Sequence, residues 1–392
     1  MLENSGVITG CDVLDIPEPS SVEVLFNESF KSTGHTNEFG QIQKRPPIDV
    51  LFASDFDEIA QAKHILGHFD VEKINVFTVS APKGILVGQR SLVTGHGQYL
   101  INDTNHSNHT YRVFSAAERR DFESLQLLPI NGAYGYRPEA QPPMEIGGTA
   151  VALTAMEHDN YGAFLLRALP KVISIKELGI RDASFVAPMN TWQSQIFASV
   201  GCDMSRFVGY DRNRTYSADN FVLPSMRTSE FFLDDSTRVF FSDISERVSF
   251  GRRTDFRYEK LYVSRIKQGL ARPDYRLFQN EAALIERLRA DGFHIFAPED
   301  HCFEEQVATF NSARIVVGPS GAGMFNTIFC RPGTTVVSLE PLLTWLQLHT
   351  NLFSSMGHNY ALVLGGADQN DPTVQKRWST DVDAVMRFLR TL

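Results

Sequence analysis

The fold is decided by one stretch of the chain, Ile315-Val316-Val317-Gly318-Pro319-Ser320-Gly321-Ala322-Gly323. Its first three residues are continuously apolar, which is typical of a strand buried on both faces of a parallel sheet. A glycine-rich loop follows, and residues 323–329 are predicted to form a helix. Phosphates settle at helix starts, where main-chain N–H groups lack partners and the helix dipole adds positive potential. The stretch therefore fits a phosphate site, in which Gly321 and Gly323 let the backbone approach an anion, and fits a plain tight turn equally well.

Polar residues end the neighbouring strands of the same unit. Ser264 and Arg265, with Lys267 close behind, follow one predicted strand, and Glu340 ends another. In open α/β sheets, ligands bind outside the carboxyl ends of the strands. Arg265 and Lys267 are therefore expected to point toward a diphosphate, with solvated surface charge as the alternative. Glu340 is expected to hold a ribose or sugar hydroxyl, or to be merely solvated.

Outward from this stretch, strands alternate with helices, as expected of a parallel sheet covered on both faces. Residues 1–148 contain short β-like runs separated by turn residues, which predicts a β-rich N-terminal region. Residues 149–235 predict a first domain with such a sheet. Residues 236–392 predict a second one, which ends in a helix. Prolines and a glycine pair near residues 134–148 mark the first boundary.

Two predicted helices carry recognisable signals at their ends and interior. Residues 160–178 are predicted to be helical with an interruption at Pro170, because proline disrupts a helix interior. Asn280 is expected to cap the helix 281–290, and Gly292 is expected to end it.

Composition narrows the classes of partner. The chain has 392 residues, 43% of them hydrophobic and 21% charged, which is an ordinary globular balance with room for more than one domain. The net charge of -9 argues against double-stranded nucleic acid as a partner, since such binding needs Lys and Arg to neutralise phosphates.

The cysteines and the N-terminus bear on the compartment. The four cysteines lie far apart and fit neither a metal site nor a disulfide framework, so idle thiols in a reducing compartment are expected. The chain begins without the basic-then-apolar run of a signal peptide, and it has no apolar run long enough to span a bilayer. We expect a cytoplasmic protein, with peripheral attachment to the inner face of the membrane left open.

Several short motifs lie before and after the glycine loop. They are Tyr262-Val263-Ser264-Arg265, Asn280-Glu281, Gly292-Phe293, Phe303-x-Glu305-Gln306-Val307, Phe310-x-x-Ala313, Gly318 to Phe329 with Asn326, and Pro332-Gly333-x-x-Val336-Val337. In this order they resemble glycosyltransferase family 61, closely over the C-terminal third. The likeness extends more loosely to His158-Asp159-Asn160-Tyr161 and to residues 165–170.

The resemblance implies an α/β fold of the GT-B type, in which two Rossmann-like domains face a cleft. It also implies inverting transfer without a metal or other cofactor. The C-terminal domain would hold a nucleotide-sugar donor. The middle domain would supply the acceptor side for a glycan or lipid-linked glycan, as in bacterial capsular polysaccharide synthesis. A homo-oligomer is left open, with residues 1–148 as either a dimer interface or an acceptor platform.

The chain departs from the family pattern at functional positions. Ser320 stands where members usually carry the histidine of His-Gly-Ala-Gly. Ala163 and Arg167 stand where many carry a histidine and an aspartate. The usual candidates for a catalytic base are therefore missing, so the base has moved, the chemistry differs, or activity is lost. Arg167 either compensates by reaching a donor phosphate or an anionic acceptor, or lies on the helix surface.

A replacement base is predicted where the first strand of the middle domain meets its helix. His158 or Asp159 would deprotonate the acceptor hydroxyl there, with Asp159 favoured. The alternatives are a helix N-cap for Asp159 and a hydrogen-bonded loop residue for His158.

The leaving diphosphate would be stabilised from the other domain. Arg265 and Lys267 would act with the main-chain amides of the glycine loop, while the Ser320 hydroxyl donates a hydrogen bond. Asn326 is expected to cap or brace the loop. These roles place the donor residues at Ser264, Arg265, Lys267, Gly318, Ser320, Gly321, Ala322, Gly323, Asn326 and Glu340.

Two Asp-x-Asp triplets, Asp55-Phe56-Asp57 and Asp381-Val382-Asp383, invite a metal interpretation, but no metal role is expected for either. In the second triplet the carboxylates lie on different sides of a helix. Two competing functions stay open, namely a pyruvyl or other group transferase on the same scaffold and a non-catalytic sugar-binding or scaffold protein. Binding of a nucleoside diphosphate, of phosphoenolpyruvate, or of neither discriminates between the three.

Overall fold

The structure is a computed structural model. It describes residues 8–11, 13–14, 23–29, 35–36, 42–53, 56, 58–71, 75–87, 91–93, 99–101, 127–130, 133–136, 142–155, 157–211, 214–251, 258–341, 343–368, 371 and 376–392. Contacts divide the chain into two compact units. Unit 1 comprises residues 1–31 and 73–228, and unit 2 comprises residues 32–72 and 229–392.

Unit 1 combines strands with short helices. Its strands are β1 (Ile8–Cys11), β2 (Val13–Leu14), β3 (Glu23–Ser29), β8 (Asn75–Pro82), β9 (Ile85–Val87), β10 (Ser91–Val93), β11 (Tyr99–Ile101), β12 (Leu127–Ile130), β13 (Ala133–Tyr136), β14 (Met144–Ala152), β15 (Ala183–Ala187), β16 (Phe207–Gly209) and β17 (Tyr216–Pro224). Its helices are α4 (Tyr161–Ala163), the π-helix η2 (Phe164–Ala168), α5 (Lys171–Glu177), α6 (Thr191–Ser199) and the 3₁₀-helix η3 (Met204–Arg206). The short strands β18 (Thr228–Ser229) and β19 (Phe232–Leu233) lie at the division between the units.

A mixed sheet organises unit 1. Strand β14 pairs in parallel with β15 and β17, and β15 pairs in parallel with β16, whereas β8 and β9 pair antiparallel to β17. The pairing of β14 with β17 shifts register between Ile146 and Thr149, and Gly148 has a φ of 71°. The glycine pair that was expected to mark a boundary at residue 148 therefore lies inside one continuous strand, where it accommodates a bulge.

The helical segment after β14 follows the sequence prediction at its start and at its break. Asn160 caps α4, because its Oδ1 accepts hydrogen bonds from Gly162 N at 3.0 Å and Ala163 N at 3.4 Å. The capping role considered for Asp159 therefore belongs to Asn160. The winding then widens into the π-helix η2, and Pro170 separates it from α5. Such π segments are frequent at functional sites.

Unit 2 carries the longer helices. Its strands are β4 (His35–Thr36), β5 (Ile42–Gln43), β6 (Asp49–Phe52), β7 (Asp70–Val71), β20 (Lys260–Val263), β21 (His294–Phe296), β22 (Ile315–Pro319), β23 (Thr335–Glu340), β24 (Asn359–Leu364), β25 (Gly366–Ala367) and β26 (Trp378–Ser379). Its helices are α1 (Ile59–Leu66), α7 (Asp235–Gly251), α8 (Ile266–Ala271), α9 (Glu281–Ala290), η4 (Pro298–Asp300), α10 (Phe303–Ser312), η5 (Ala322–Phe329), η6 (Leu343–Trp345), α11 (Leu346–Ser355) and α12 (Val382–Leu389).

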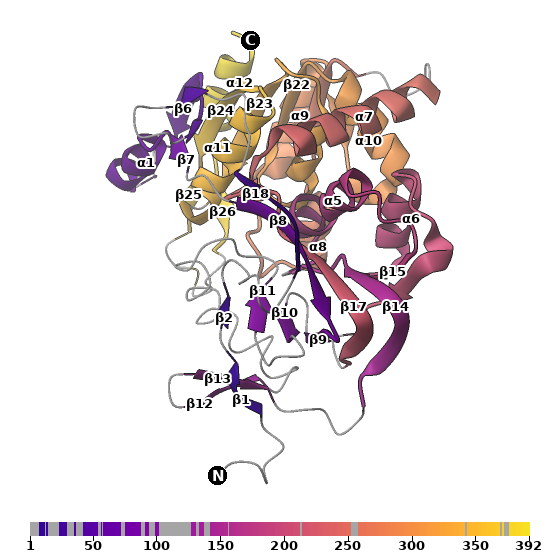
Figure 1. Ribbon diagram of the computed structural model, residues 1–392. Coiled ribbons are helices and arrows are strands. Elements are labelled where there is room, and N and C mark those ends of the chain that lie inside the picture. The colour runs from indigo at the N-terminus through magenta and orange to yellow at the C-terminus, as the bar shows by residue number, and fades with distance from the viewer. Residues whose placement is uncertain are drawn as a thin grey trace. The chain divides into compact units, whose positions relative to one another are not determined.

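The main sheet of unit 2 is parallel throughout, in the order β21-β20-β22-β23-β24-β6. Figure 1 labels four of its neighbouring strands, β22, β23, β24 and β6. One face is buried under α9 and α12, with Tyr262 and Val317 on the strands packing with Leu288 and Val385 on the helices. The alternate strand residues, such as Val316, are buried as well, so both faces are covered. The last strand of the order, β6, comes from residues that were assigned to the N-terminal region.

The winding of this sheet reverses between β20 and β22. From β20 the chain continues to β21 on one side, whereas from β22 it continues to β23 on the other side. The order matches the doubly wound pattern 2-1-3-4-5, whose switch point lies between its first and third strands. In open α/β sheets, ligands bind at the carboxyl edge of such a point.

Unit 2 also corrects two local predictions. The segment after β22 is the 3₁₀-helix η5, not the α-helix expected at residues 323–329. Asn280 precedes α9, but its side chain does not cap that helix. Its Nδ2 donates to Thr380 O at 2.7 Å, and its Oδ1 accepts from Thr380 N at 3.2 Å. Among the described residues, none of the helices combines the length and apolar character that crossing a bilayer demands.

Candidate functional site

The predicted donor residues gather at the switch point of unit 2. Ser264 and Arg265 directly follow β20. The glycine loop ends β22 and leads into η5. Because β20 and β22 are adjacent parallel strands, their carboxyl ends meet at one edge of the sheet. The structure therefore places the loop and Arg265 together, as the sequence predicted.

Arg265 lies against the glycine loop. Its Nη1 donates a hydrogen bond to Ser320 O at 2.7 Å. A Cβ on Gly321 would lie 2.9 Å from that Nη1, and Gly321 has a φ of 154°. A Cβ on Gly323 would lie 3.0 Å from Val263 Cγ1. The sequence predicted that these glycines let the backbone approach an anion, but in the structure their missing Cβ atoms admit the Arg265 guanidinium and the side chain of Val263.

The Ser320 hydroxyl, which was predicted to donate to the diphosphate, instead forms a hydrogen bond with the Glu340 side chain. Ser320 N donates to Leu339 O at 2.8 Å, and the Ser320 side chain is buried. Ala322 and Gly323 are half-buried at the start of η5. A guanidinium fixed on the loop thus presents the positive charge that the helix start was expected to supply.

A buried carboxylate positions Arg265. The Oε1 of Glu281 accepts hydrogen bonds from Arg265 N at 2.7 Å, Ser264 Oγ at 3.0 Å and Tyr262 OH at 3.3 Å. Burial raises the pKa of Glu281, against the effect of these hydrogen bonds. The Ser264 hydroxyl, predicted as a donor ligand, is therefore committed to Glu281. The motif Asn280-Glu281 was visible in the sequence, but nothing in it indicated this contact.

A second cation beside Arg265 was missed from the sequence. The Nη2 of Arg276 donates to Tyr275 OH at 3.1 Å, and its Cζ lies 4.7 Å from the centre of the Tyr275 ring. Arg272 approaches the same ring at 4.5 Å. The Nε of Arg276 is buried without a hydrogen-bond partner among the described residues, and Arg276 has a φ of 51°. Backbone strain and unpaired buried donors concentrate at functional sites.

The two arginines are close enough to repel each other. Burial, followed by the charge of Arg276, lowers the pKa of Arg265 to about 10. Within the part of the chain that the structure describes, neither Arg265 nor Arg276 forms an ion pair with a carboxylate. An anion bound between them would relieve this repulsion, so the pair is suited to hold a diphosphate.

Two further predicted donor residues, Lys267 and Asn326, have structural partners. Lys267 forms an exposed ion pair with Asp300. Asn326 is buried and donates through Nδ2 to Gln306 Oε1 at 2.8 Å, so its side chain joins η5 to α10. Gln306 in turn donates to the main-chain oxygens of Pro298 and His301, so η5 is tied to the segment before α10.

Glu340 is fully buried, so the prediction that it is solvated is wrong. Its Oε1 accepts from Ser338 Oγ at 2.6 Å and contacts His349 Nδ1 at 2.9 Å. Burial alone would raise the pKa of Glu340, but the charge of His349 and hydrogen bonds from His349, Ser338 and Ser320 hold it below its usual value. Glu340 therefore stabilises the interior at the end of β23.

The predicted base lies in unit 1, in the loop after β14. The His158 side chain is 3% exposed and the Asp159 side chain is 56% exposed, with Nε2 and Oδ1 separated by 4.0 Å. His158 Nδ1 accepts a hydrogen bond from Ala155 N at 3.4 Å. The proton of the neutral ring is thereby assigned to Nε2, which faces Asp159. His158 is thus the hydrogen-bonded loop residue considered from the sequence, and Asp159 is accessible.

Unpredicted charged groups surround this loop. Glu157 has a φ of 57°, and its carboxylate lies 3.9 Å from Arg167 on the π-helix. Arg167 is 17% exposed, so the prediction of a solvated surface arginine is wrong. Lys171 is fully buried, and its Nζ donates to Thr154 O at 2.5 Å. The strained Glu157 therefore lies near the half-buried Arg167, and the buried Lys171 is bonded to the main chain at Thr154.

The acidic triplets add no metal site where they are described. Asp381 Oδ1 caps α12 by accepting from Ala384 N at 2.9 Å, and Asp383 forms an ion pair with Arg287 at 2.9 Å. Asp55 and Asp57 lie outside the described residues. Within the described residues there is no group of three or more His, Cys, Asp or Glu side chains that could hold a metal ion.

Comparison with known proteins identifies part of the chain. Residues 161–337 match the family model described as Glycosyltransferase 61. This span contains Arg265, Arg276 and the whole glycine loop. It begins two residues after Asp159 and ends before Glu340. The comparison with curated proteins found no match.

Proposed function

Residues 161–337 form a glycosyltransferase family 61 domain, and on the premise that the chain is a glycosyltransferase we propose that it uses a nucleoside diphosphate sugar as donor. The diphosphate would bind at the switch point of unit 2. The observation that carries the proposal is the contact of the Arg265 guanidinium with the glycine loop, with Arg276 beside it and no carboxylate paired with either among the described residues.

These cations would stabilise the negative charge that develops during sugar transfer. When the bond between the sugar and the diphosphate breaks, negative charge grows on the leaving phosphate. Donors fixed in advance stabilise that charge without reorganising. A hydrogen bond to a charged group contributes about 1.5–3 kcal/mol, so Arg265 and Arg276 could together replace a divalent ion. We therefore propose a transfer that needs no metal.

On the acceptor side, we propose Asp159 as the base. Its carboxylate would take the proton of the acceptor hydroxyl as the hydroxyl oxygen attacks the anomeric carbon and the diphosphate leaves, which inverts that carbon. His158 would orient Asp159 through its Nε2 proton. The acceptor would be a glycan or lipid-linked glycan of a bacterial polysaccharide, and the two units would adopt the GT-B arrangement that the family resemblance implies.

Nucleotide binding tests the donor half of the proposal. The diphosphates of uridine, cytidine, guanosine and adenosine would be titrated by calorimetry in EDTA, and phosphoenolpyruvate would be titrated alongside. One nucleotide should bind, and Arg265→Ala should weaken that binding by about tenfold or more. Arg289→Ala is the matched control, because Arg289 is exposed on α9 outside the site.

Three outcomes would count against the donor site. Absence of nucleotide binding would remove it. Equal binding by wild type and Arg265→Ala would take Arg265 out of it. Binding of phosphoenolpyruvate in place of any nucleotide would favour transfer of a pyruvyl group.

A further inference from the structure

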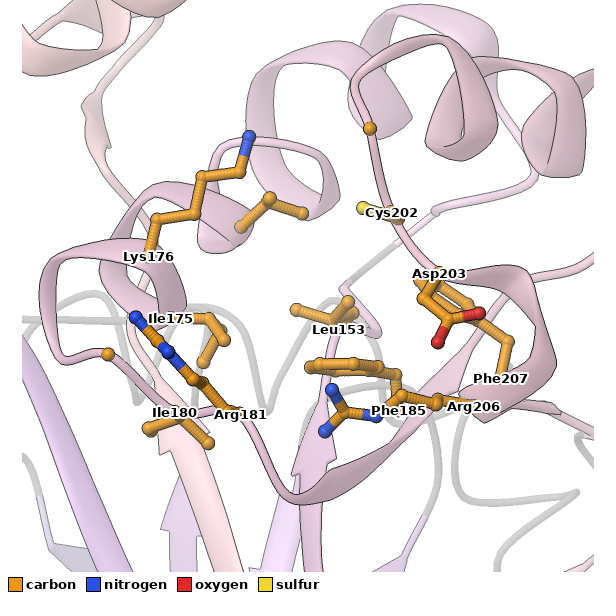
Figure 2. A pocket seen from close by; sticks show the side chains of 13 residues that line it. Leu153, Ile175, Lys176, Ile180, Arg181, Phe185, Cys202, Asp203, Arg206 and Phe207 are labelled. Atoms are coloured by element: carbon orange, nitrogen blue, oxygen red, sulfur yellow. The ribbon is translucent and has the colours of Figure 1, made fainter.

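A pocket in unit 1 contains none of the donor or acceptor residues described above. Its volume is about 350 Å³, which lies within the range of small-molecule sites. It is bounded by the end of β14, by α5 and the turn after it, by β15, and by the segment that carries η3 and β16. Figure 2 shows its lining side chains.

Apolar side chains form the walls of the pocket. Leu153 and Phe185 lie in the middle of the view in Figure 2, between Arg181 on one side and Asp203 on the other. Ile175 and Ile180 line the pocket as well. Apolar walls around an open volume favour a ligand with an apolar body, since each buried methylene raises affinity by roughly fourfold.

Cations line the same pocket. Lys176, Arg181 and Arg206 contribute positive charge. Arg206 is fixed in place, because its Nε and Nη2 donate to Ala183 O at 2.9 and 2.5 Å and its Cζ lies 5.1 Å from the centre of the Phe185 ring. Arg181 is exposed and forms no ion pair or hydrogen bond with any described residue.

The lining also contains one carboxylate, Asp203, which offsets only part of this positive charge. Asp203 accepts hydrogen bonds from Ser205 N at 3.1 Å and Ser205 Oγ at 2.7 Å, and these bonds lower its pKa. The lining contains three cations and one carboxylate, so the pocket combines a net positive charge with apolar walls. Charge complementarity therefore favours an anionic group at the rim.

We propose that the pocket binds a single-chain amphiphile, with its alkyl chain against Leu153, Ile180 and Phe185 and its phosphate beside Arg181 and Arg206. A purely apolar ligand would leave Arg181 without an anionic partner among the described residues, and a free anion would leave the apolar walls exposed to water. The proposal does not depend on the sugar donor, because no residue of the donor site lines this pocket.

Octyl phosphate is the probe, used below its aggregation concentration in calorimetry with the full chain. It should bind at least about tenfold more tightly than either octanol or inorganic phosphate, because each of these has half of the required chemistry. Arg181→Ala should weaken octyl phosphate binding by about tenfold, whereas Arg289→Ala should leave it unchanged. Ile180→Trp, which fills the pocket without changing its charge, should weaken it as well.

Cys202 gives an independent readout, because it lines the pocket. Burial raises the pKa of the Cys202 thiol to about 11, so its reaction with N-ethylmaleimide is slow enough to time. Octyl phosphate should slow the modification of Cys202 further, followed by peptide mass spectrometry, and should leave the exposed Cys302 unaffected.

The proposal is overturned if octyl phosphate fails to bind, or binds wild type, Arg181→Ala and Ile180→Trp equally. Equal binding of octanol would leave an apolar site only, and equal binding of inorganic phosphate would leave an anion site only. Nucleotide binding by Arg181→Ala should match wild type, so failure here is distinguishable from failure at the donor site.

Discussion

Replacing Gly321 with alanine tests whether the absence of a side chain at this position is what lets the Arg265 guanidinium lie against the glycine loop. A Cβ at this position would lie 2.9 Å from Arg265 Nη1, which is too close for unbonded atoms, and 3.2 Å from Arg265 Cζ, which is a tight contact. Gly321 also has a φ of 154° and a ψ of -172°, a region that glycine alone adopts readily. Gly321→Ala should therefore carry about 1–3 kcal/mol of backbone strain and push Arg265 off the loop.

The size of the effect on binding follows from what Arg265 loses. Displacement breaks its hydrogen bond to Ser320 O and removes the guanidinium from the diphosphate. A hydrogen bond to a charged group contributes about 1.5–3 kcal/mol, so the dissociation constant of the bound nucleoside diphosphate should rise roughly 10- to 100-fold. The melting temperature should fall as well, because of the strain.

The assay needs a control that separates strain from contact. Gly292 has a φ of 81°, and a Cβ there would meet no described heavy atom within 4 Å. Gly292→Ala should lower the melting temperature in differential scanning fluorimetry while leaving the calorimetric dissociation constant unchanged.

The double variant Gly321→Ala with Arg265→Ala supplies the decisive comparison. It should bind the nucleotide no more weakly than Arg265→Ala alone, because both changes remove the same contact. Additive losses, or an unchanged dissociation constant in Gly321→Ala, would refute the role assigned to the glycine.

Two further predictions concern the proposed base and a buried lysine. Asp159→Asn should keep nucleotide binding and lower single-turnover sugar transfer by about 10²–10⁴-fold, and full transfer would move the role of base to His158. Burial lowers the pKa of Lys44 to about 8, against the charge of Glu230. The unfolded chain therefore binds more protons between about pH 8 and 10.5, and this lysine should add stability as the pH rises through that window. Measured by urea unfolding, wild type should gain about 3 kcal/mol relative to Lys44→Met from pH 8 to 10.5, and a constant difference would contradict the burial of its charge.

The strands of unit 2 were predictable because their signal is local. Residues 315–317 are continuously apolar, which is typical of buried parallel strands, and they form the start of β22; the apolar Val336, Val337 and Leu339 mark β23. Strand β6 was visible as a short run, but its place beside β24 was not. Which edge a strand joins depends on distant partners, so the noncontiguous division of the chain could not be derived from local pattern.

Glycine has two meanings in a strand region, and the sequence could not choose between them. The pair at residues 147–148 was interpreted as a turn between domains. In the structure it accommodates a register shift within β14, where Gly148 has a positive φ. The same ambiguity affected the glycine loop, in which close packing on Val263 and Arg265 explains the residues. Only the three-dimensional neighbours distinguish the cases.

The sequence predicted where the candidate donor site lies, but it did not reveal all of the residues there. Parallel topology brings the ends of β20 and β22 to one edge, so Arg265 and the loop could be placed together from the sequence. Arg276 could not, because it follows a turn and adopts a positive φ that no residue pattern signals. Lys267 was predicted from its charge and its place just after a predicted strand, but nothing in the sequence indicated its ion pair with Asp300.

Burying the charged Arg265 costs free energy, and the electrostatics of this site show what offsets that cost. Lowering the pKa of Arg265 to about 10 from 12.5 corresponds to about 3 kcal/mol against its charged form. Glu281 offsets part of that cost through the Arg265 main chain, and it leaves the guanidinium without a paired carboxylate among the described residues. A bound diphosphate would supply the missing counter-charge, and more of it as the sugar departs. If the proposed diphosphate binds beside Arg265 and Arg276, the charge that grows on the leaving phosphate would be held more strongly than the charge of the bound donor, so loss of either arginine should slow transfer more than it unfolds unit 2.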